Sequence, residues 1–248
     1  MNDTCFACSS SATTHEHVPP ACLFPETKDT GGNQDFRRNL ITVPACADHN
    51  LRKSSDDEYF LWVLSTNLLA NSVARQQVST KLRRANERRP ALGQLILSDT
   101  KDVTVVDSHS GIEHNVVEVS LDGTRFQRVL DLVAIGIYRH HFRERWPGSI
   151  RVHPDFIGYA DSGQILDVDT DRLVLFDAAE KLFATKSKYG ENPDVFWYQV
   201  HKPKDKYRCL MRFTFYNGCK ATAFFAEGSD NTRLQMAALR AVAESQQR

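Results

Sequence analysis

Apolar residues recur every three or four positions in two long stretches of this chain, and that spacing predicts amphipathic helices. The first stretch covers residues 54–89 and begins with the acids Asp56, Asp57 and Glu58, which suit the positive end of a helix dipole. The second covers residues 126–142, where apolar side chains again gather on one face. An Ala-rich segment, Thr232 to Ser245, predicts a third helix.

A different pattern predicts strands in the second half of the chain. Polar and apolar residues alternate from Lys101 to Leu121 around Ser110-Gly111, which is typical of a β-hairpin. Runs of β-branched and aromatic residues predict further strands at 149–159, 172–176, 195–201 and 207–225. Helices and strands together predict an α+β fold with a mixed α+β domain at the C-terminal end.

The first 54 residues differ in composition from the rest of the chain. They are rich in Cys, Pro, Gly, Asn and Thr and lack long periodic apolar runs. Such a segment buries little apolar surface, so a bound metal would have to supply much of its stability. We therefore expect three parts: a small metal-bound module at 1–60, a basic helical connector at 61–95, and a C-terminal domain of unassigned role at 96–248.

Charge excludes one class of protein and leaves another open. The chain carries 31 basic and 31 acidic residues, which argues against a uniformly basic nucleic-acid coat protein but allows a local basic groove. From Arg75 to Arg89 there are six basic residues against the single acid Glu87, a local excess of five. This segment is either a solvated helix face or a phosphate-contacting surface, for which the candidates are Lys81, Arg83, Arg84, Arg88 and Arg89.

The chain shows no feature of export or membrane insertion. No apolar run approaches the ~20 residues that span a bilayer, and the first residues lack a positive segment followed by an apolar one. We expect a cytoplasmic protein without a membrane partner. In a reducing compartment, paired cysteines are metal ligands more often than disulfides.

Two ligand pairs bracket the N-terminal segment. Cys5-x-x-Cys8 precedes Cys46-x-x-His49, and four sulfur and nitrogen ligands in two pairs suit a closed, structural, tetrahedral zinc site. The remaining cysteines, Cys22, Cys209 and Cys219, fit small buried hydrophobes better.

Between those pairs lies a second group of chemically useful residues. The acid Glu16 precedes His17, and the amides Asn39 and Asn50 follow. An oxygen ligand beside a histidine suits a harder cation, Mg²⁺ or Mn²⁺, with a base next to it. Adjacent strand residues point to opposite faces, so a bend must bring Glu16 and His17 to the same site.

The order Cys-x-x-Cys, Glu16-His17-Val18-Pro19, Asn39-Leu40, Cys46-x-x-His49-Asn50 and Lys53 resembles the HNH endonucleases of the ββα-metal (His-Me finger) superfamily. The resemblance is to the subclass that holds a zinc ion around the catalytic hairpin, and it covers residues 5–53. His49 departs from the pattern, since cysteine is usual there. A Cys₃His set is nevertheless a common structural zinc site.

The resemblance implies metal-dependent hydrolysis of phosphodiester bonds, most often in DNA, with RNA left open. It implies that His17 is the general base and that Glu16 and Asn50 bind the catalytic Mg²⁺ or Mn²⁺. It also implies that Asn39 braces the loop carrying His17 and that Lys53 contacts phosphate. Proteins of this kind serve in phage defence or mobile elements. Because one such site cuts one strand, cutting both requires a homodimer or two successive nicks.

Two alternatives stay open at this point. One is a non-catalytic, zinc-dependent nucleic-acid-binding protein. The other is a nuclease gated by a ligand or a partner protein that the C-terminal domain binds. The aromatic runs at 196–198 and 213–216 and the basic cluster at 139–146 fit core packing and helix-end hydrogen bonds better than base stacking.

Overall fold

The computed structural model describes residues 4–32, 34–88, 90, 93–94, 99–106, 111–157, 160–161, 164–165, 170–202 and 208–226. Helices and strands are both present, which confirms the predicted α+β class. The helix predicted at 232–245 lies outside the described residues.

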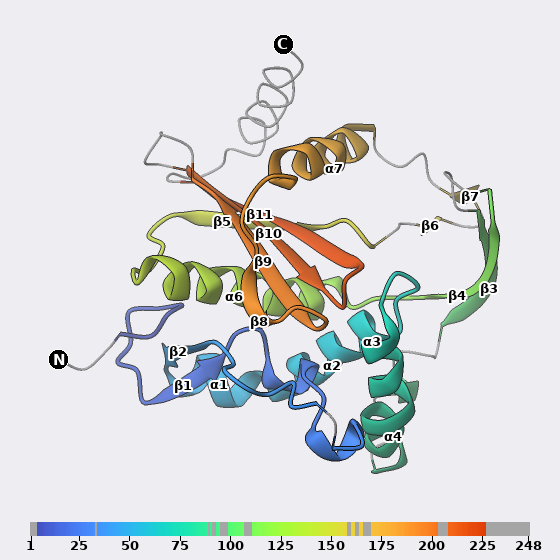
Figure 1. Ribbon diagram of the computed structural model, residues 1–248, viewed down its shortest axis with the longest axis horizontal. Helices are drawn as coiled ribbons and strands as arrows, with labels where there is room; N and C mark the ends of the chain where they lie inside the picture. Colours follow the sequence, from blue (N-terminus) through green and yellow to red (C-terminus); the bar gives the residue numbers. More distant parts are fainter. Residues whose placement is uncertain are drawn as a thin grey trace.

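The N-terminal segment forms a hairpin followed by helix. Strand β1 (Thr14–His17) pairs antiparallel with β2 (Thr42–Ala45), and the loop between them contains the short 3₁₀ turns η1 (Ala21–Leu23) and η2 (Thr27–Asp29). After β2, the chain continues as α1 (Ala47–Asn50), η3 (Leu51–Lys53) and α2 (Ser54–Ser65). The order is therefore strand, strand, helix (Figure 1).

The helical prediction for 54–89 is confirmed in type but not in continuity. After α2 the chain turns, and Asn71 begins a new helix because its Oδ1 accepts from the amides of Val73 and Ala74 at 3.1 and 3.2 Å. Helix α3 (Ser72–Gln77) then continues through a π-helical turn, η4 (Val78–Leu82), into α4 (Arg83–Arg88).

A five-stranded antiparallel sheet forms the second half of the molecule, in the order β5-β11-β10-β9-β8. Its strands are β5 (Ser149–Pro154), β8 (Tyr189–Asn192), β9 (Phe196–His201), β10 (Arg208–Phe215) and β11 (Cys219–Ala226). The sheet lies between α6 (Gly123–Phe142) on one face and α7 (Thr170–Phe183) on the other (Figure 1). The predicted helix at 126–142 and the predicted strands at 149–159, 195–201 and 207–225 are confirmed in type.

The predicted strand at 172–176 is wrong, because that segment belongs to α7. Leu175, Ala178, Ala179 and Leu182 are buried against Phe224 of the sheet. Their spacing of three and four residues is that of a helix, and it outweighs the strand preference of a short apolar run.

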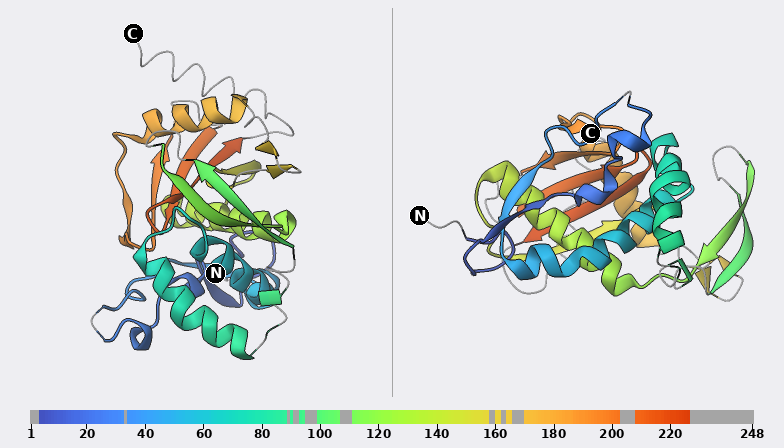
Figure 2. Two further views of the ribbon diagram at one scale, coloured as in Figure 1. Left: turned by 90° about the vertical axis from the view of Figure 1, so that its right-hand side faces the viewer. Right: turned by 90° about the horizontal axis from the view of Figure 1, so that it is seen from below.

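The hairpin predicted from Lys101 to Leu121 is confirmed. Strand β3 (Thr100–Val106) pairs antiparallel with β4 (Glu113–Val119), and the two project from the body of the molecule beside the short pair β6 (Ala160–Asp161) and β7 (Gln164–Ile165) (Figure 2).

The N-terminal segment and the sheet share one hydrophobic core. Phe60 of α2 packs on Phe126 of α6 and on Phe215 of β10, with ring centroids 5.1 and 5.6 Å apart. The aromatic side chains of 196, 198, 213, 215 and 216 are buried in the same core, as the sequence indicated. The predicted boundary after residue 60 lies inside α2, and Phe60 of this helix packs on both α6 and β10.

Gly136 marks a close approach of α6 to Val18, the residue that follows β1. A Cβ at this position would lie 2.6 and 2.8 Å from the two γ-carbons of the buried Val18. We expect Gly136→Ala to lower the free energy of unfolding by up to ~2 kcal/mol, because overpacking costs ~1–3 kcal/mol and the better helix propensity of alanine returns ~1 kcal/mol. Urea denaturation measures this difference.

Gly123→Ala is the matched control for that substitution, since nothing lies within 4 Å of its added Cβ in the same helix. Equal stabilities of the two variants would contradict the tight contact between α6 and Val18.

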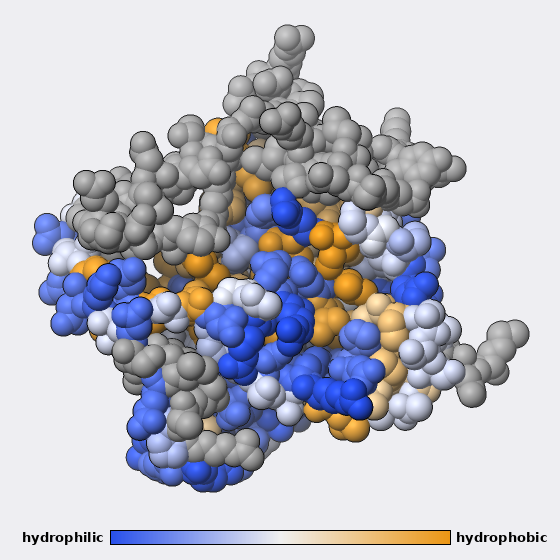
Figure 3. Space-filling model, turned by 180° about the vertical axis from the view of Figure 1, so that it is seen from behind, coloured by the Kyte–Doolittle hydropathy of each residue, from blue (hydrophilic) through white to orange (hydrophobic). Residues whose placement is uncertain are grey.

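The surface agrees with the mixed composition. On the face seen from behind, hydrophobic residues form several separate groups among hydrophilic ones in the described part of the chain (Figure 3). Among the described helices, none is both long and apolar enough to cross a membrane.

Candidate functional site

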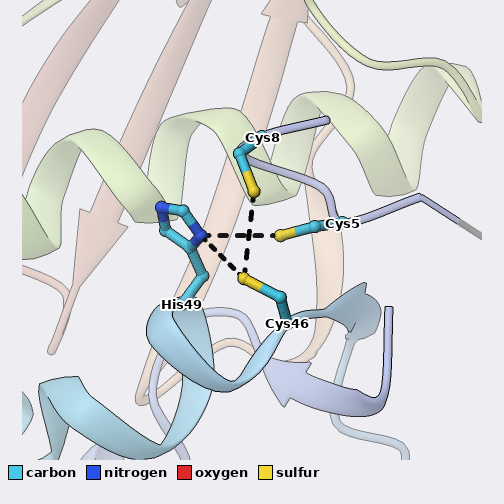
Figure 4. Close-up of side chains that lie close together, drawn as sticks. All are labelled: Cys5, Cys8, Cys46 and His49. Carbon is cyan, nitrogen blue, oxygen red and sulfur yellow. Dashed lines mark hydrogen bonds between the residues drawn. The ribbon is translucent and has the colours of Figure 1, made fainter. Parts of the chain in front are cut away.

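The two predicted ligand pairs meet at one point. Cys5 and Cys8 lie in the turn that precedes β1, Cys46 lies at the start of α1, and His49 lies within that helix (Figure 4). Their ligand atoms all lie within 4.8 Å of one another. Backbone bonds fix the turn, since the amide of Cys5 donates to the Ser10 carbonyl at 2.9 Å and that of Phe6 to the Pro44 carbonyl at 2.8 Å.

The spacing of these atoms fits a tetrahedral zinc ion. Zn–S bonds of ~2.3 Å and Zn–N bonds of ~2.0 Å at tetrahedral angles separate two sulfurs by ~3.8 Å and a sulfur from a nitrogen by ~3.5 Å. Here Cys8 and Cys46 Sγ lie 3.8 Å apart, and His49 Nδ1 lies 3.6 Å from Cys5 Sγ and 3.2 Å from Cys46 Sγ. The cluster can therefore hold a metal ion, and its four protein ligands are those of a closed structural zinc site.

Asn50 connects the helix to the hairpin. Its Nδ2 donates to Thr14 Oγ1 at 2.9 Å and to the His15 carbonyl at 3.0 Å. Thr14 and Glu16 share one face of β1 because alternate strand residues point the same way. Asn50 and Glu16 are thereby placed at the same side of the strand.

Glu16 is buried in an ion pair. Its Oε1 lies 2.8 Å from Lys53 Nζ, which also lies 2.6 Å from both carboxylate oxygens of Asp57. Burial raises the pKa of Glu16 to about 6, and the Lys53 charge opposes that rise. The phosphate contact predicted for Lys53 is wrong, because only 5% of this residue is exposed and its ammonium is held by two carboxylates.

His17 ends β1 and is half-buried. It lines a shallow pocket together with Glu16 and Lys53. That the acid and the histidine serve one catalytic site stays a prediction. Burial lowers the pKa of the His17 imidazole, and the positive charges of Arg37 and Lys53 lower it further. The ring is therefore neutral and able to accept a proton near pH 7.

Helix α6 forms the opposite wall of this pocket through Val129, Leu132 and Val133. The C-terminal half of the chain therefore contributes directly to the surroundings of Glu16 and His17, which the sequence did not indicate.

Asn39 lies apart from that pocket's lining residues, exposed at the end of the β1–β2 loop. Its backbone is left-handed, with φ of 54°, a conformation that asparagine tolerates better than most residues. The next residue towards the N-terminus, Arg38, has its carbonyl held by Asn192 Nδ2 at 3.0 Å. The bracing role predicted for the Asn39 side chain stays a prediction.

Three residues that the sequence did not single out for this role hold the loop after His17. Gln77 Nε2 and Tyr216 Oη donate to the Leu23 carbonyl at 2.9 and 2.6 Å, and Lys81 Nζ donates to the Cys22 carbonyl at 2.8 Å. Gln77 and Lys81 are four residues apart in the helical region, so their shared face was readable from the sequence. No local signal points to Tyr216.

The basic segment is divided between internal and exposed residues. Lys81 donates to the Cys22 carbonyl of the β1–β2 loop, and Arg84 forms two hydrogen bonds with the Asp29 carboxylate at 2.7 and 2.9 Å. These two residues therefore stabilise the β1–β2 loop and are not free phosphate contacts. Arg83 and Arg88 are exposed and keep that candidate role, whereas Arg89 lies outside the described residues.

The basic cluster at the end of α6 has a structural role. Arg139 Nη1 donates to the Arg143 carbonyl at 2.7 Å, and Trp146 is buried. The helix-end interpretation is borne out for Arg139, whose guanidinium bonds the carbonyl of the residue that ends α6.

No protein-family model matches this chain, and neither a curated protein nor a solved structure matches it significantly.

Proposed function

We propose that this protein is a divalent-metal-dependent endonuclease of the HNH type, acting on DNA, with RNA as the other candidate substrate. One observation carries the proposal: Glu16 and His17 line a single pocket, and Asn50 is fastened to the same strand beside a site of zinc geometry. An acid, a neutral imidazole and an amide on a strand–strand–helix frame are the groups that the HNH reaction needs.

The residues fit a hard divalent cation. Lys53 Nζ lies 2.8 Å from Oε1 of the Glu16 carboxylate, and a carboxylate has two oxygens that can each accept more than one partner, so Glu16 could also bind a metal. Asn50 uses Nδ2 for its two hydrogen bonds, which leaves the carbonyl oxygen Oδ1. Carboxylate and amide oxygens are the ligand atoms that Mg²⁺ and Mn²⁺ prefer.

Within this proposal, a bound cation supplies charge stabilisation at the phosphate. His17 accepts the proton of the attacking water at the imidazole, because its lowered pKa keeps the ring neutral. Glu16 and Asn50 hold and orient the cation. The zinc cluster fixes the helix that carries Asn50 relative to the hairpin that carries Glu16.

A cleavage assay with the zinc-loaded full-length chain tests the proposal. Supercoiled plasmid should be nicked with Mg²⁺ or Mn²⁺ and stay intact when the divalent cation is omitted. Single-stranded and duplex RNA run in parallel decide the substrate. If no nucleic acid is cut under any condition while duplex binding persists, the protein is the non-catalytic zinc-dependent binder instead.

The gated nuclease is a second candidate, favoured by the wall that α6 adds to the pocket. In that case a ligand or partner of the C-terminal half would alter the position of this wall. Cleavage by the purified chain alone, at a rate typical of a nuclease, would contradict gating. A defence or mobile-element role is compatible with either candidate and rests on the family resemblance alone.

A further inference from the structure

Asp57 lies behind the ion pair of Glu16 and has no role in the proposed reaction. It belongs to the first turn of α2, and its side chain is only 15% exposed. Both of its oxygens lie 2.6 Å from Lys53 Nζ, which lies 2.8 Å from Glu16 Oε1. The three side chains form a buried chain of charges, acid, ammonium, acid, that ends at the pocket.

The charges in this chain do not cancel. Two carboxylates share one ammonium, so the group carries a net charge of −1 when both acids are ionised. Water screens such a buried group weakly, since Glu16 and Lys53 are only 6% and 5% exposed. The uncompensated charge attracts a cation towards the pocket, which Glu16 and Lys53 both line.

We propose that Asp57 is a positioning residue for divalent-cation binding, acting through Lys53 on the Glu16 carboxylate. This inference rests on the proposed function. Asp57 shares the Lys53 ammonium with Glu16, so the charge of the Glu16 carboxylate is only partly neutralised. Through Lys53 it also keeps the Glu16 side chain in one orientation. Hydrogen-bonded supports of this kind behind a metal-binding carboxylate typically change metal affinity by ~10–100-fold.

The chain offers a matched control one residue away. The Asp56 side chain is 10% exposed on the same helix, against 15% for Asp57, and it pairs with Arg125 Nε at 2.8 Å and Arg128 Nη1 at 2.9 Å of α6. Asp56→Asn removes a buried charge from the same turn of α2 but leaves the ion pairs among Glu16, Lys53 and Asp57 in place. Both substitutions keep the size and shape of the side chain.

The test measures Mn²⁺ binding to zinc-loaded, full-length protein from the electron paramagnetic resonance signal of free Mn²⁺ at pH 8. Asp57→Asn should weaken Mn²⁺ binding ~10-fold or more, Asp56→Asn should leave it within twofold of wild type, and Asp57→Glu should restore it at least in part. Circular dichroism verifies that each variant is folded at the temperature used.

Three results would overturn the inference, and they have different consequences. Wild-type affinity in Asp57→Asn, or equal weakening in both asparagine variants, would remove the role of Asp57 but leave the proposed nuclease intact. A wild-type protein that binds no Mn²⁺ would refute the proposed metal-dependent function and the inference together.

Discussion

His17→Ala is expected to lower the rate of phosphodiester cleavage by ~10²–10⁴, the usual contribution of a positioned general base. The imidazole is half-buried, lines the pocket beside Glu16, and has a pKa lowered by burial and by nearby positive charge. Alanine removes the proton acceptor but leaves the zinc ligands and the Glu16 ion pair in place. Single-turnover cleavage of a labelled duplex at saturating Mg²⁺ measures the effect without interference from product release.

His15→Ala is the matched control for this substitution. His15 lies two residues earlier on the same strand, its side chain is exposed, and its contact with Asn50 uses the backbone carbonyl, which alanine retains. Its cleavage rate should stay within about twofold of wild type. A similar loss in both variants would mean that the strand, and not the His17 imidazole, is what matters, and full activity in His17→Ala would exclude it as the base.

The fold could be predicted from the sequence wherever one periodicity dominated. Helix α6 and the β3–β4 hairpin show clean spacings of three to four residues and of two residues, and both predictions are confirmed. Residues 172–176 failed because a five-residue apolar run fits either element, and only the contact with Phe224 decides for the helix.

Packing between distant segments was not readable in the same way. From the sequence we predicted a separate module at residues 1–60, because this segment contains few periodic apolar residues. The structure adds long-range contacts that no local pattern encodes, such as Val18 against Gly136 and Tyr216 against the Leu23 carbonyl. The N-terminal segment therefore packs into the common core as well as forming the Cys/His cluster.

The candidate site shows the same division. The Cys5/Cys8/Cys46/His49 cluster could be predicted from ligand spacing, because four sulfur and nitrogen ligands in two pairs have few other uses. The phosphate contact expected of Lys53 came from the family resemblance, and only the burial of Lys53 between Glu16 and Asp57 reveals an internal partner. Charge along a sequence predicts how many ions a segment carries but not which of them pair with each other.

Cys46→Ser is expected to release zinc and unfold the N-terminal segment, which is the largest stability effect we predict. Apparent binding free energies of structural zinc in small modules reach ~10–16 kcal/mol at neutral pH, comparable with the entire ~5–15 kcal/mol stability of a typical domain. Cys46 also begins α1, so its loss separates the helix carrying Asn50 from the hairpin. Zinc content by mass spectrometry and amide hydrogen exchange of β1 and β2 measure the two consequences.

Cys22→Ser provides the matched control, because Cys22 lies outside the cluster and its Sγ donates to the Asp57 carbonyl at 3.3 Å, a bond that serine can also make. This variant should keep its zinc and the protection of both strands. Because Cys5, Phe6 and Val43 are part of the core that includes α6, loss of zinc should also increase exchange in α6 near Val133. Wild-type protein purified without zinc yet protected in β1 and β2 would contradict the structural role of the metal, and protection of α6 that does not change in Cys46→Ser would show that the shared core does not depend on it.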